Sequence, residues 1–271
     1  MSDGLERLAG WPGSRRAAGW RNRSGEQATA GDATETFALA SVTKLLTTTA
    51  VLVAVQEEIV ALDEPAGPPG STVRLLLCHA SGLPFDDAGT VTPPAQRRIY
   101  GNPAFDVLGA LVAERAEVEL PNYVSEAVLE PLGMMATTVT GSPAHGARST
   151  LDDLLRFADE LLRPGRVLAP ELLDEAATPQ LPDLDGVLPG FGRQRPNPWG
   201  LGFEVKGTKV PHWTPPEASP RTFGHFGQSG TFLWVDPDAG VACVGLANRA
   251  FGDWARQEWP ALGTAVWVAA G

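Results

Sequence analysis

The chain has 271 residues, enough to bury a substantial hydrophobic core as one large domain or two interlocked ones. With 43% hydrophobic and 20% charged residues, the composition is that of a globular protein and excludes an intrinsically disordered chain. The net charge of -11, without a long basic run, argues against nucleic acid as a partner because little would neutralise the phosphates.

The cysteines and the N-terminus indicate where in the cell the protein is expected to be. Cys78 and Cys243 are far apart, and residues 241–246 form an apolar run typical of a buried strand, so we expect two reduced packing cysteines. No Cys or His pairs have the spacing of a zinc site. Residues 1–10 lack the apolar segment of a signal peptide, and no stretch approaches the roughly 18 apolar residues of a membrane span. These features predict a soluble, cytoplasmic protein without a metal or an obligate protein partner.

The first two thirds of the chain are expected to be mainly helical. Residues 15–40 alternate short apolar patches with Gly, Asn and Ser, which predicts a hairpin. Thr43 to Glu57 is apolar nearly all round, which predicts a buried helix. Further helices are expected over residues 73–79, 103–116, 123–129 and 150–162, the third of them ended by Pro131 and Gly133. The Pro- and Gly-rich segments 63–71 and 179–198 predict loops.

The last third changes character. Short strands separated by turn residues are expected over 199–205, 222–225, 231–236 and 240–246. The final helix, 253–269, is expected to be interrupted at Pro260. Strands near both termini with helices between them predict an α+β fold, in which an antiparallel sheet is flanked by terminal helices. We expect residues 1–60 and 195–271 to form the sheet domain, residues 61–194 an inserted helical domain, and the active site to lie between them.

Ser41 and Lys44 begin the buried helix and carry the first chemical signal. Residues at i and i+3 share a helix face, so the hydroxyl and the amine can point into one cleft. Backbone N–H groups at a helix N-terminus stabilise negative charge, and burial would lower the pKa of Lys44 until its neutral amine accepts a proton. With eleven serines and three lysines in the chain, about 0.1 such pairs are expected by chance. Taken alone, a helix N-cap at Ser41 and a solvated Lys44 explain the pair equally well.

Two more motifs follow in the chain. Tyr100-Gly101-Asn102 precedes the helix at Pro103, and a phenol near a lysine can be stabilised as phenolate and shuttle protons, although a packed aromatic in a turn is the alternative. The run 224–230 contains His225-Phe226-Gly227, whose small neighbours let a substrate lie along the strand with a backbone N–H aimed at its carbonyl oxygen. The alternative is a strand histidine near a tight turn.

The remaining candidates carry weaker signals. Lys206-Gly207-Thr208 is expected to form a turn, and His79 lies among apolar residues and is expected to be structural. His145 and His212 lie in loops with no visible partner, and Trp199 and Trp213 are candidates for lining a cleft.

In this order, the three motifs closely resemble those of the serine β-lactamase and penicillin-binding protein superfamily. Segments 37–44, 75–84, 131–134 and 224–227 are similar to its class C-type branch, which includes class C β-lactamases, D-alanyl-D-alanine carboxypeptidases and β-lactamase-fold esterases. The resemblance runs from about residue 31 to residue 249 and implies a β-lactamase/transpeptidase-like fold.

The resemblance also implies a role for each motif residue. Ser41 is similar to the family nucleophile, Lys44 to the base that activates it, and Tyr100 to the proton relay. Asn102 would contact the substrate or Lys44. The backbone N–H groups of Ser41 and Gln228 would form the oxyanion hole.

Two departures bear on the substrate. Gly101 stands where the family frequently has serine, and His225, which with Gly227 would border the substrate, stands where lysine is common. A neutral histidine holds a carboxylate less firmly than a permanent cation.

The sequence therefore predicts an esterase-like serine hydrolase that cleaves a small-molecule ester or amide through a Ser41 acyl-enzyme and needs no cofactor. A D-alanyl-D-alanine carboxypeptidase or a β-lactamase, acting on peptides or β-lactams, is the alternative. A non-catalytic ligand-binding module on the same fold is an alternative of another class.

Overall fold

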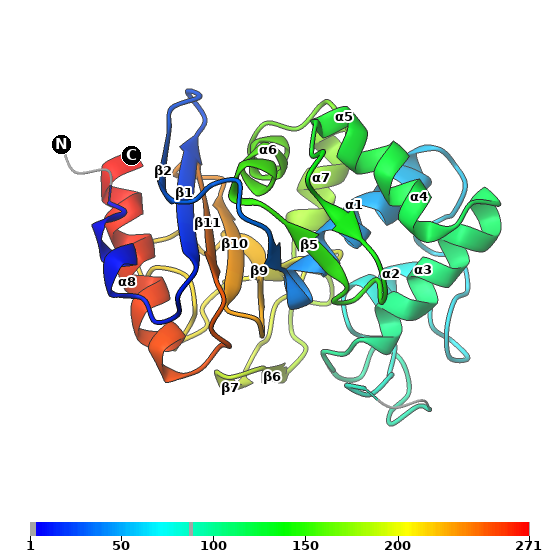
Figure 1. Ribbon diagram of the computed structural model, residues 1–271. Coiled ribbons are helices and arrows are strands. Elements are labelled where there is room, and N and C mark those ends of the chain that lie inside the picture. Colours follow the sequence, from blue (N-terminus) through cyan, green and yellow to red (C-terminus); the bar gives the residue numbers. More distant parts are fainter. Residues whose placement is uncertain (1–3, 87–88, 271) are drawn as a thin grey trace.

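The computed structural model describes residues 4–86 and 89–270, in which a six-stranded antiparallel sheet stands beside a mainly helical region (Figure 1). The strand order is β2-β1-β11-β10-β9-β8. The sheet strands are β1 Arg16–Asn22, β2 Gln27–Gly31, β8 Glu204–Val205, β9 Phe223–Gly227, β10 Thr231–Asp236 and β11 Val241–Ala247. The predicted α+β class and the N-terminal hairpin are confirmed.

The two ends of the chain meet in this sheet. Strand β1 pairs antiparallel with β11, with Trp20 opposite Cys243. The C-terminal helix α8, Asp253–Ala270, and a 3-10 turn, Glu6–Gly10, lie together on the outer face of the sheet (Figure 1). Segments from the two ends of the sequence thus build the sheet and cover one of its faces.

The central strands β9, β10 and β11 are buried on both faces, which explains their apolar sequences, whereas the edge strand β2 is largely exposed. Neighbouring residues of a strand point to opposite faces. Cys243 belongs to the core shared with Trp259 of α8, whereas Val244 belongs to the core shared with α1, Thr43–Gln56, and α6, Leu151–Leu162. Both cysteines are buried and free, as predicted.

The remaining helices lie on the α1 side of the sheet (Figure 1). The other helical segments are α2 Val73–Leu77, α3 Pro103–Ala116, α4 Leu120–Val124, a π-helical turn Ser125–Leu129, α5 Glu130–Leu132 and α7 Pro170–Ala177. A small sheet contains β3 Phe37–Ala38, β4 Thr138–Val139 and β5 Ala147–Ser149, and a separate hairpin contains β6 Gly186–Leu188 and β7 Gly192–Gln194. Within the described ranges, no helix combines the length and apolar character that crossing a membrane requires.

Some predicted boundaries are wrong. The helix expected over 123–129 begins at Leu120 and continues past Pro131 to Leu132, and α8 runs through Pro260 without a break. A proline removes one hydrogen bond from a helix, and burial of the apolar face of α8 against the sheet outweighs that loss. The segment 179–198, expected to be loop, contains the β6–β7 hairpin, because backbone pairing forms there without an apolar pattern.

The helix α6 connects the two parts of the fold. It belongs to the middle of the sequence, yet its apolar side chains pack on the face of the sheet formed by β1, β10 and β11. The division into residues 1–60 with 195–271 and residues 61–194 stays a prediction.

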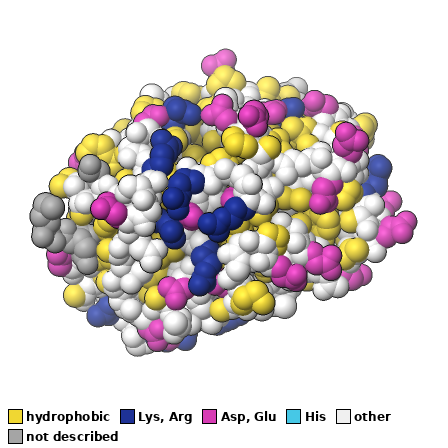
Figure 2. Space-filling view, turned by 90° about the horizontal axis from the view of Figure 1, so that it is seen from above, with side chains coloured by type: hydrophobic (Ala, Val, Ile, Leu, Met, Phe, Trp, Pro, Cys, Tyr) yellow, Lys and Arg dark blue, Asp and Glu magenta, His cyan; other side chains and the backbone are white. Residues whose placement is uncertain are grey.

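Charge is unevenly distributed over the surface. Figure 2 shows Lys and Arg side chains gathered in a band on the face seen from above, although the chain carries a net charge of -11. At the end of α6, one carboxylate, Asp159, forms ion pairs with Arg21, Arg163 and Arg166. These ion pairs connect β1 to the segment that follows α6.

Glu160 holds the connection between α6 and α7. Its side chain accepts hydrogen bonds from the backbone N–H groups of four successive residues, 165–168, at 3.0–3.3 Å. The residue is only 2% exposed. Because buried N–H groups without a partner are costly, this carboxylate fixes the loop that leads into α7.

We expect Glu160→Ala to lower the free energy of unfolding by about 3 kcal/mol, since it leaves several buried donors unpaired. Glu160→Gln keeps one accepting oxygen and should lose less. Chemical denaturation measures both, with Glu114→Ala on the exposed side of α3 as the control. Equal midpoints for Glu160→Ala and the control would show that the loop is held by other contacts.

Candidate active site

Ser41 lies in a short 3-10 turn, Ala40–Val42, directly before α1. Ala40 adopts the left-handed conformation, with φ of 45°, which is strained for a residue with a side chain. The end of β9 packs against this turn so closely that a Cβ atom on Gly227 would lie 2.2 Å from the carbonyl oxygen of Leu39. Gly227 is therefore required for β9 to approach the nucleophile.

The hydroxyl of Ser41 is engaged in the site and does not cap the helix. The N-cap of α1 is Val42, without a side-chain cap. The Tyr100 hydroxyl donates a hydrogen bond to Ser41 Oγ at 2.7 Å. The alternative of an ordinary N-cap serine is wrong, because the side chain points to the tyrosine from the second motif.

Lys44 is completely buried, with 0% exposure, so the alternative of a solvated lysine is also wrong. Its Nζ donates to Asn102 Oδ1 at 2.7 Å and to the Ala144 carbonyl at 3.1 Å, and it lies 4.8 Å from the centre of the Tyr100 ring. Burial lowers the pKa of Lys44 to about 7, against the opposing effect of Asp106 and Asp86. About half of the amine is therefore neutral at neutral pH and able to accept a proton.

Asn102 is oriented by two partners of opposite kind. Its amide nitrogen donates to the Asp86 carboxylate, and its amide oxygen accepts from Lys44. An ammonium is only a donor and a carboxylate only an acceptor, so with Lys44 charged the two contacts fix which amide atom faces which side. Sequence reasoning missed Asp86, which lies in a loop and has no motif that marks it.

The structure explains why Gly101 stands in place of serine. A Cβ atom at this position would lie 2.2 Å from the Pro84 carbonyl oxygen. The same loop accepts a hydrogen bond from the Asn102 N–H at the Phe85 carbonyl, at 2.8 Å. The approach of this loop, which also brings Asp86 to Asn102, is thus possible only with glycine at 101.

Tyr100 is surrounded by aromatic rings. His79 and Trp199 lie with ring centres 4.9 and 5.7 Å from its own. Burial raises the pKa of Tyr100 far above its usual value, and the hydrogen bond to Ser41 offsets only part of this. The prediction of a phenolate is therefore wrong for the resting site, where Tyr100 is a neutral phenol and a proton donor. His79 is buried beside it, as predicted.

His225 is neutral and has a defined tautomer. Its Nδ1 lies 2.6 Å from the Phe226 carbonyl oxygen, which only accepts, so Nδ1 carries the proton. Burial and the nearby charge of Lys44 lower the pKa of His225 to about 3. The ring therefore provides no cation to the site at neutral pH.

These residues border a cavity of about 110 Å³, here called the inner compartment. It is lined by Ser41, Phe85, Tyr100, Leu188, Pro189, Trp199, Glu204, His225, Phe226 and Gln228. The structure thus brings together the predicted residues Ser41, Tyr100, His225 and Gln228, with Lys44 and Asn102 behind Ser41 and Tyr100. Trp199 lines the compartment, whereas Trp213 is buried in the core on the α8 side of the sheet.

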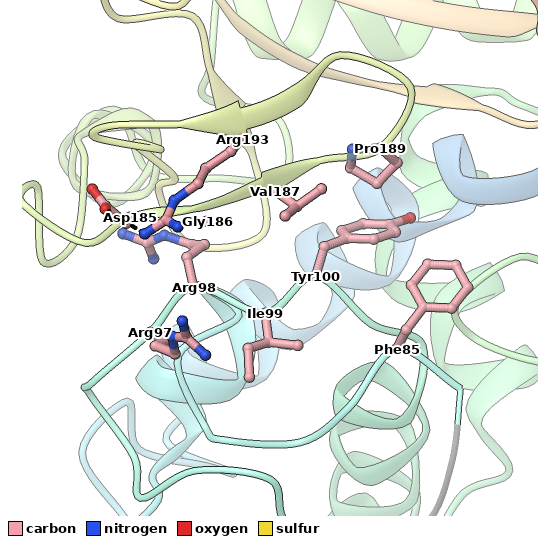
Figure 3. Close-up of a pocket in the computed structure, with 10 residues that line it drawn as sticks. All are labelled: Phe85, Arg97, Arg98, Ile99, Tyr100, Asp185, Gly186, Val187, Pro189 and Arg193. Atoms are coloured by element: carbon pink, nitrogen blue, oxygen red, sulfur yellow. Dashed lines mark hydrogen bonds and ion pairs between the residues drawn. The ribbon is translucent and has the colours of Figure 1, made fainter.

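A second cavity of about 360 Å³, the outer compartment, shares Phe85, Tyr100 and Pro189 with the first. Figure 3 shows it between the β6–β7 hairpin and the segment 97–100, with the Tyr100 hydroxyl at the end away from Arg97 and Arg193. Its walls are apolar near Tyr100 and carry arginines farther out. The hairpin that sequence reasoning missed thus forms one wall of the cleft.

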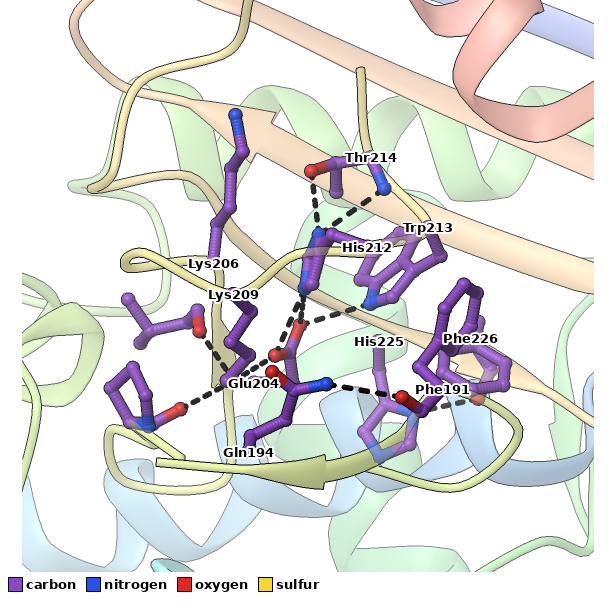
Figure 4. Close-up of polar contacts among 12 residues, drawn as sticks. Phe191, Gln194, Glu204, Lys206, Lys209, His212, Trp213, Thr214, His225 and Phe226 are labelled. Atoms are coloured by element: carbon purple, nitrogen blue, oxygen red, sulfur yellow. Dashed lines mark hydrogen bonds and ion pairs between the residues drawn. The ribbon is translucent and has the colours of Figure 1, made fainter. Parts of the chain in front are cut away.

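A buried ionic cluster supports the wall that contains Trp199 (Figure 4). Glu204 accepts hydrogen bonds from Lys209, His212 and Trp213, and Lys209 also donates to the Pro198 carbonyl at 2.9 Å. Burial alone would raise the pKa of Glu204, but His212 and Lys209 hold it below its usual range. The partner of His212, which was not visible in the sequence, is thus Glu204 on the strand β8, eight residues away.

Arg98 holds the segment that carries Tyr100. This buried guanidinium donates to the backbone carbonyls of Cys78, Gln180, Leu181 and Asn197. Sequence reasoning missed Arg98, although it precedes the second motif by two residues, because the carbonyls it binds come from distant segments.

The Beta-lactamase family model matches residues 9–265. The chain belongs to the β-lactamase family. A crystal structure of a β-lactamase from Mycobacterium bovis is 52% identical to this chain, with a TM-score of 0.96 and 98% of both chains covered. This membership places the chain in a family of hydrolases with the predicted β-lactamase/transpeptidase-like fold.

More distant proteins share the fold or part of the sequence. A solved hydrolase with promiscuous acyltransferase activity is 17% identical, with a TM-score of 0.80 and 98% of both chains covered, a likeness that shows the fold alone. A β-lactamase from Pseudomonas fluorescens is 24% identical over 201 residues, which are 58% of this chain and 56% of that protein. This β-lactamase-family chain thus spans about half the length of the curated β-lactamase it matches.

The pKa of Lys44 gives a testable pH dependence. We expect the rate at which a fluorophosphonate labels the protein to rise with pH through about 7, as the amine of Lys44 loses its proton. In the Asp86→Asn variant, the amide oxygen at position 86 still accepts from Asn102, but the negative charge that stabilises the Lys44 ammonium is removed. The pH at which the labelling rate is half-maximal should therefore fall by roughly 0.5 to 1 unit.

The matched control is Asp253→Asn, which removes an exposed charge at the start of α8, on the other face of the sheet. Its midpoint should equal that of the unchanged protein. A midpoint for Asp86→Asn that coincides with this control would contradict the coupling between Asp86 and Lys44.

Proposed function

We propose that the protein is a serine hydrolase of esterase type, which cleaves a small-molecule ester through an acyl-enzyme on Ser41. The observation that carries the proposal is the pair of contacts around the nucleophile. Ser41 Oγ accepts from the Tyr100 hydroxyl at 2.7 Å, and the fully buried Lys44 contacts the same tyrosine ring. A nucleophile beside a proton donor and a lysine with lowered pKa is the arrangement that covalent acyl transfer needs.

The proposed reaction follows from the protonation states. Ser41 Oγ attacks the ester carbonyl carbon, and its proton passes to the neutral amine of Lys44. When the bond to the leaving alcohol breaks, the alkoxide takes the phenolic proton of Tyr100, which Lys44 then replaces. In the second half of the reaction, water attacks the carbonyl carbon of the acyl-enzyme and gives a proton to Lys44. Ser41 Oγ then leaves with the proton of Tyr100, which Lys44 replaces, and the acid is released.

Backbone donors are proposed to stabilise the oxyanion. Ser41 and Gln228 both line the inner compartment, and the contact of Gly227 with the Leu39 carbonyl brings the strand end to the nucleophile. The N–H groups of Ser41 and Gln228 are proposed to bind the carbonyl oxygen of the substrate as charge develops on it.

The neutral His225 supports an ester in preference to a substrate that must carry a carboxylate. A lysine at this position would attract a carboxylate, whereas His225, with a pKa lowered to about 3, does not. The name of the 52% identical Mycobacterium bovis protein favours β-lactam hydrolysis as a second candidate. The carboxypeptidase alternative has no such support, and the intact Ser41, Lys44 and Tyr100 disfavour a non-catalytic module.

The sizes of the two compartments support an extended substrate. An inner compartment of about 110 Å³ is smaller than the roughly 300–1,000 Å³ of typical ligand pockets. We therefore place the reacting carbonyl in the inner compartment and the rest of the substrate in the outer one, past Tyr100 and Pro189.

The proposal is tested by labelling the protein with a fluorophosphonate and with a fluorescent penicillin, followed by mapping of the adducts by mass spectrometry. We expect the phosphonate on Ser41, no label in Ser41→Ala, and at least a 100-fold loss of p-nitrophenyl ester hydrolysis in that variant.

Ser229→Ala, which changes another serine near the end of β9, is the control and should label normally. Labelling of another residue, or unchanged ester hydrolysis in Ser41→Ala, would exclude the proposed mechanism. Faster acylation by the penicillin than by the phosphonate would favour the β-lactamase alternative.

A further inference from the structure

Two side-chain nitrogens that belong to residues lining the inner compartment are buried without a hydrogen-bond partner among the described residues. They are Nε2 of His225 and the indole Nε1 of Trp199. The two rings are neighbours, with their centres 5.5 Å apart and their planes at 67°. Both nitrogens of the neighbouring His79 are also unpaired, but His79 does not line the compartment. Because a buried polar atom without a partner is costly, the two that belong to lining residues beside the nucleophile point to a ligand group.

The two atoms are of opposite kind. The proton of His225 is on Nδ1, which donates to the Phe226 carbonyl, so Nε2 offers a lone pair and accepts. An indole nitrogen only donates. The lining of the compartment therefore includes one acceptor and one donor that none of the described residues satisfies.

The geometry points to a substrate with a hydroxyl group close to its reacting carbonyl, bound between His225 and Trp199. We infer that its O–H donates to His225 Nε2 and that its oxygen accepts from Trp199 Nε1. This inference rests on the proposed function and specifies the substrate class as esters of hydroxy acids.

Other polar groups fit the two atoms less well. A carboxylate has only acceptors, so one of its oxygens would face the lone pair of His225. In a trans secondary amide the N–H and the C=O point in opposite directions, so an N–H bound to His225 would turn the only amide acceptor away from it, whereas a hydroxyl donates and accepts at one atom. A plain alkyl group leaves both atoms unpaired, and a site built for a hydroxyl discriminates strongly against an analogue that lacks it.

The remaining contacts of both rings keep the pair in place. His225 is 3% exposed and lies on β9 opposite Leu233 of β10, so its main chain is fixed by the sheet. Trp199 follows Pro198, whose carbonyl is bound by Lys209 of the Glu204 cluster. The ionic cluster behind the wall thus holds the donor that the hydroxyl would meet.

The test compares three p-nitrophenyl esters of similar length: butyrate, 3-hydroxybutyrate and the hemisuccinate, which ends in a carboxylate. We expect kcat/KM for the hydroxybutyrate to exceed that for the butyrate by about 10- to 100-fold, with the hemisuccinate lowest. In His225→Phe, which keeps a ring but removes the acceptor, the ratio of hydroxybutyrate to butyrate should fall to about one.

Two further variants complete the comparison. His225→Asn keeps an acceptor at this position and should retain part of the preference, which separates the loss of the acceptor from misfolding. His145→Phe, at an exposed loop position, should leave the ratio unchanged. Equal kcat/KM for hydroxybutyrate and butyrate in the unchanged protein would overturn the inference, as would a preference that survives in His225→Phe.

Labelling of Ser41 separates this inference from the proposed function. If the phosphonate labels Ser41 and the esters are hydrolysed without a preference for the hydroxyl, only the substrate class is wrong. If Ser41 is not labelled and none of the esters is hydrolysed, the proposed function fails, and the inference fails with it.

Discussion

The burial of one ammonium group determines the chemistry of this site. Lys44 has no exposed surface, and its pKa falls from 10.5 to about 7, so keeping its charge inside the protein costs about 5 kcal/mol. This net cost already includes the opposing charges of Asp106 and Asp86, and the ammonium also donates to the Asn102 amide oxygen and the Ala144 carbonyl. Fewer of these groups would lower the pKa of Lys44 further, so the amine would be neutral throughout the physiological pH range. More of them would raise its pKa, so it would stay charged and unable to accept a proton.

The same charge affects the other ionisable groups of the cleft. The pKa values of both His79 and His225 are lowered, first by burial and then by the positive charge of Lys44. Tyr100 keeps its proton because it too is buried. The inner compartment is therefore lined by the neutral imidazole of His225 and the neutral phenol of Tyr100, with the titrating amine of Lys44 behind them and the Glu204 carboxylate already paired with Lys209 and His212. The proposed uncharged reacting group fits such a site, which would select it by hydrogen bonds and not by ion pairs.

The motifs could be found from the sequence because each lies within a few residues. Ser41 with Lys44, the Tyr100 triplet and the His225 triplet were marked by short spacings on a helix, a turn and a strand. Asp86, Arg98 and Glu204 could not be found in this way, because their partners lie far away in the sequence and meet them only in the folded chain. The β6–β7 hairpin was missed because its backbone pairing forms without an apolar pattern, and the continuous α8 was missed because packing against the sheet overrode the local signal of Pro260.

The charge of Lys44 is the central claim, and NMR measures it directly. The chain has only three lysines, so selective labelling of their side chains with ¹³C and ¹⁵N gives a simple spectrum. The signal that disappears in Lys44→Met belongs to Lys44, and its shift should titrate with a midpoint near pH 7. A Lys44 signal that remains that of an ammonium up to pH 10 would contradict the account.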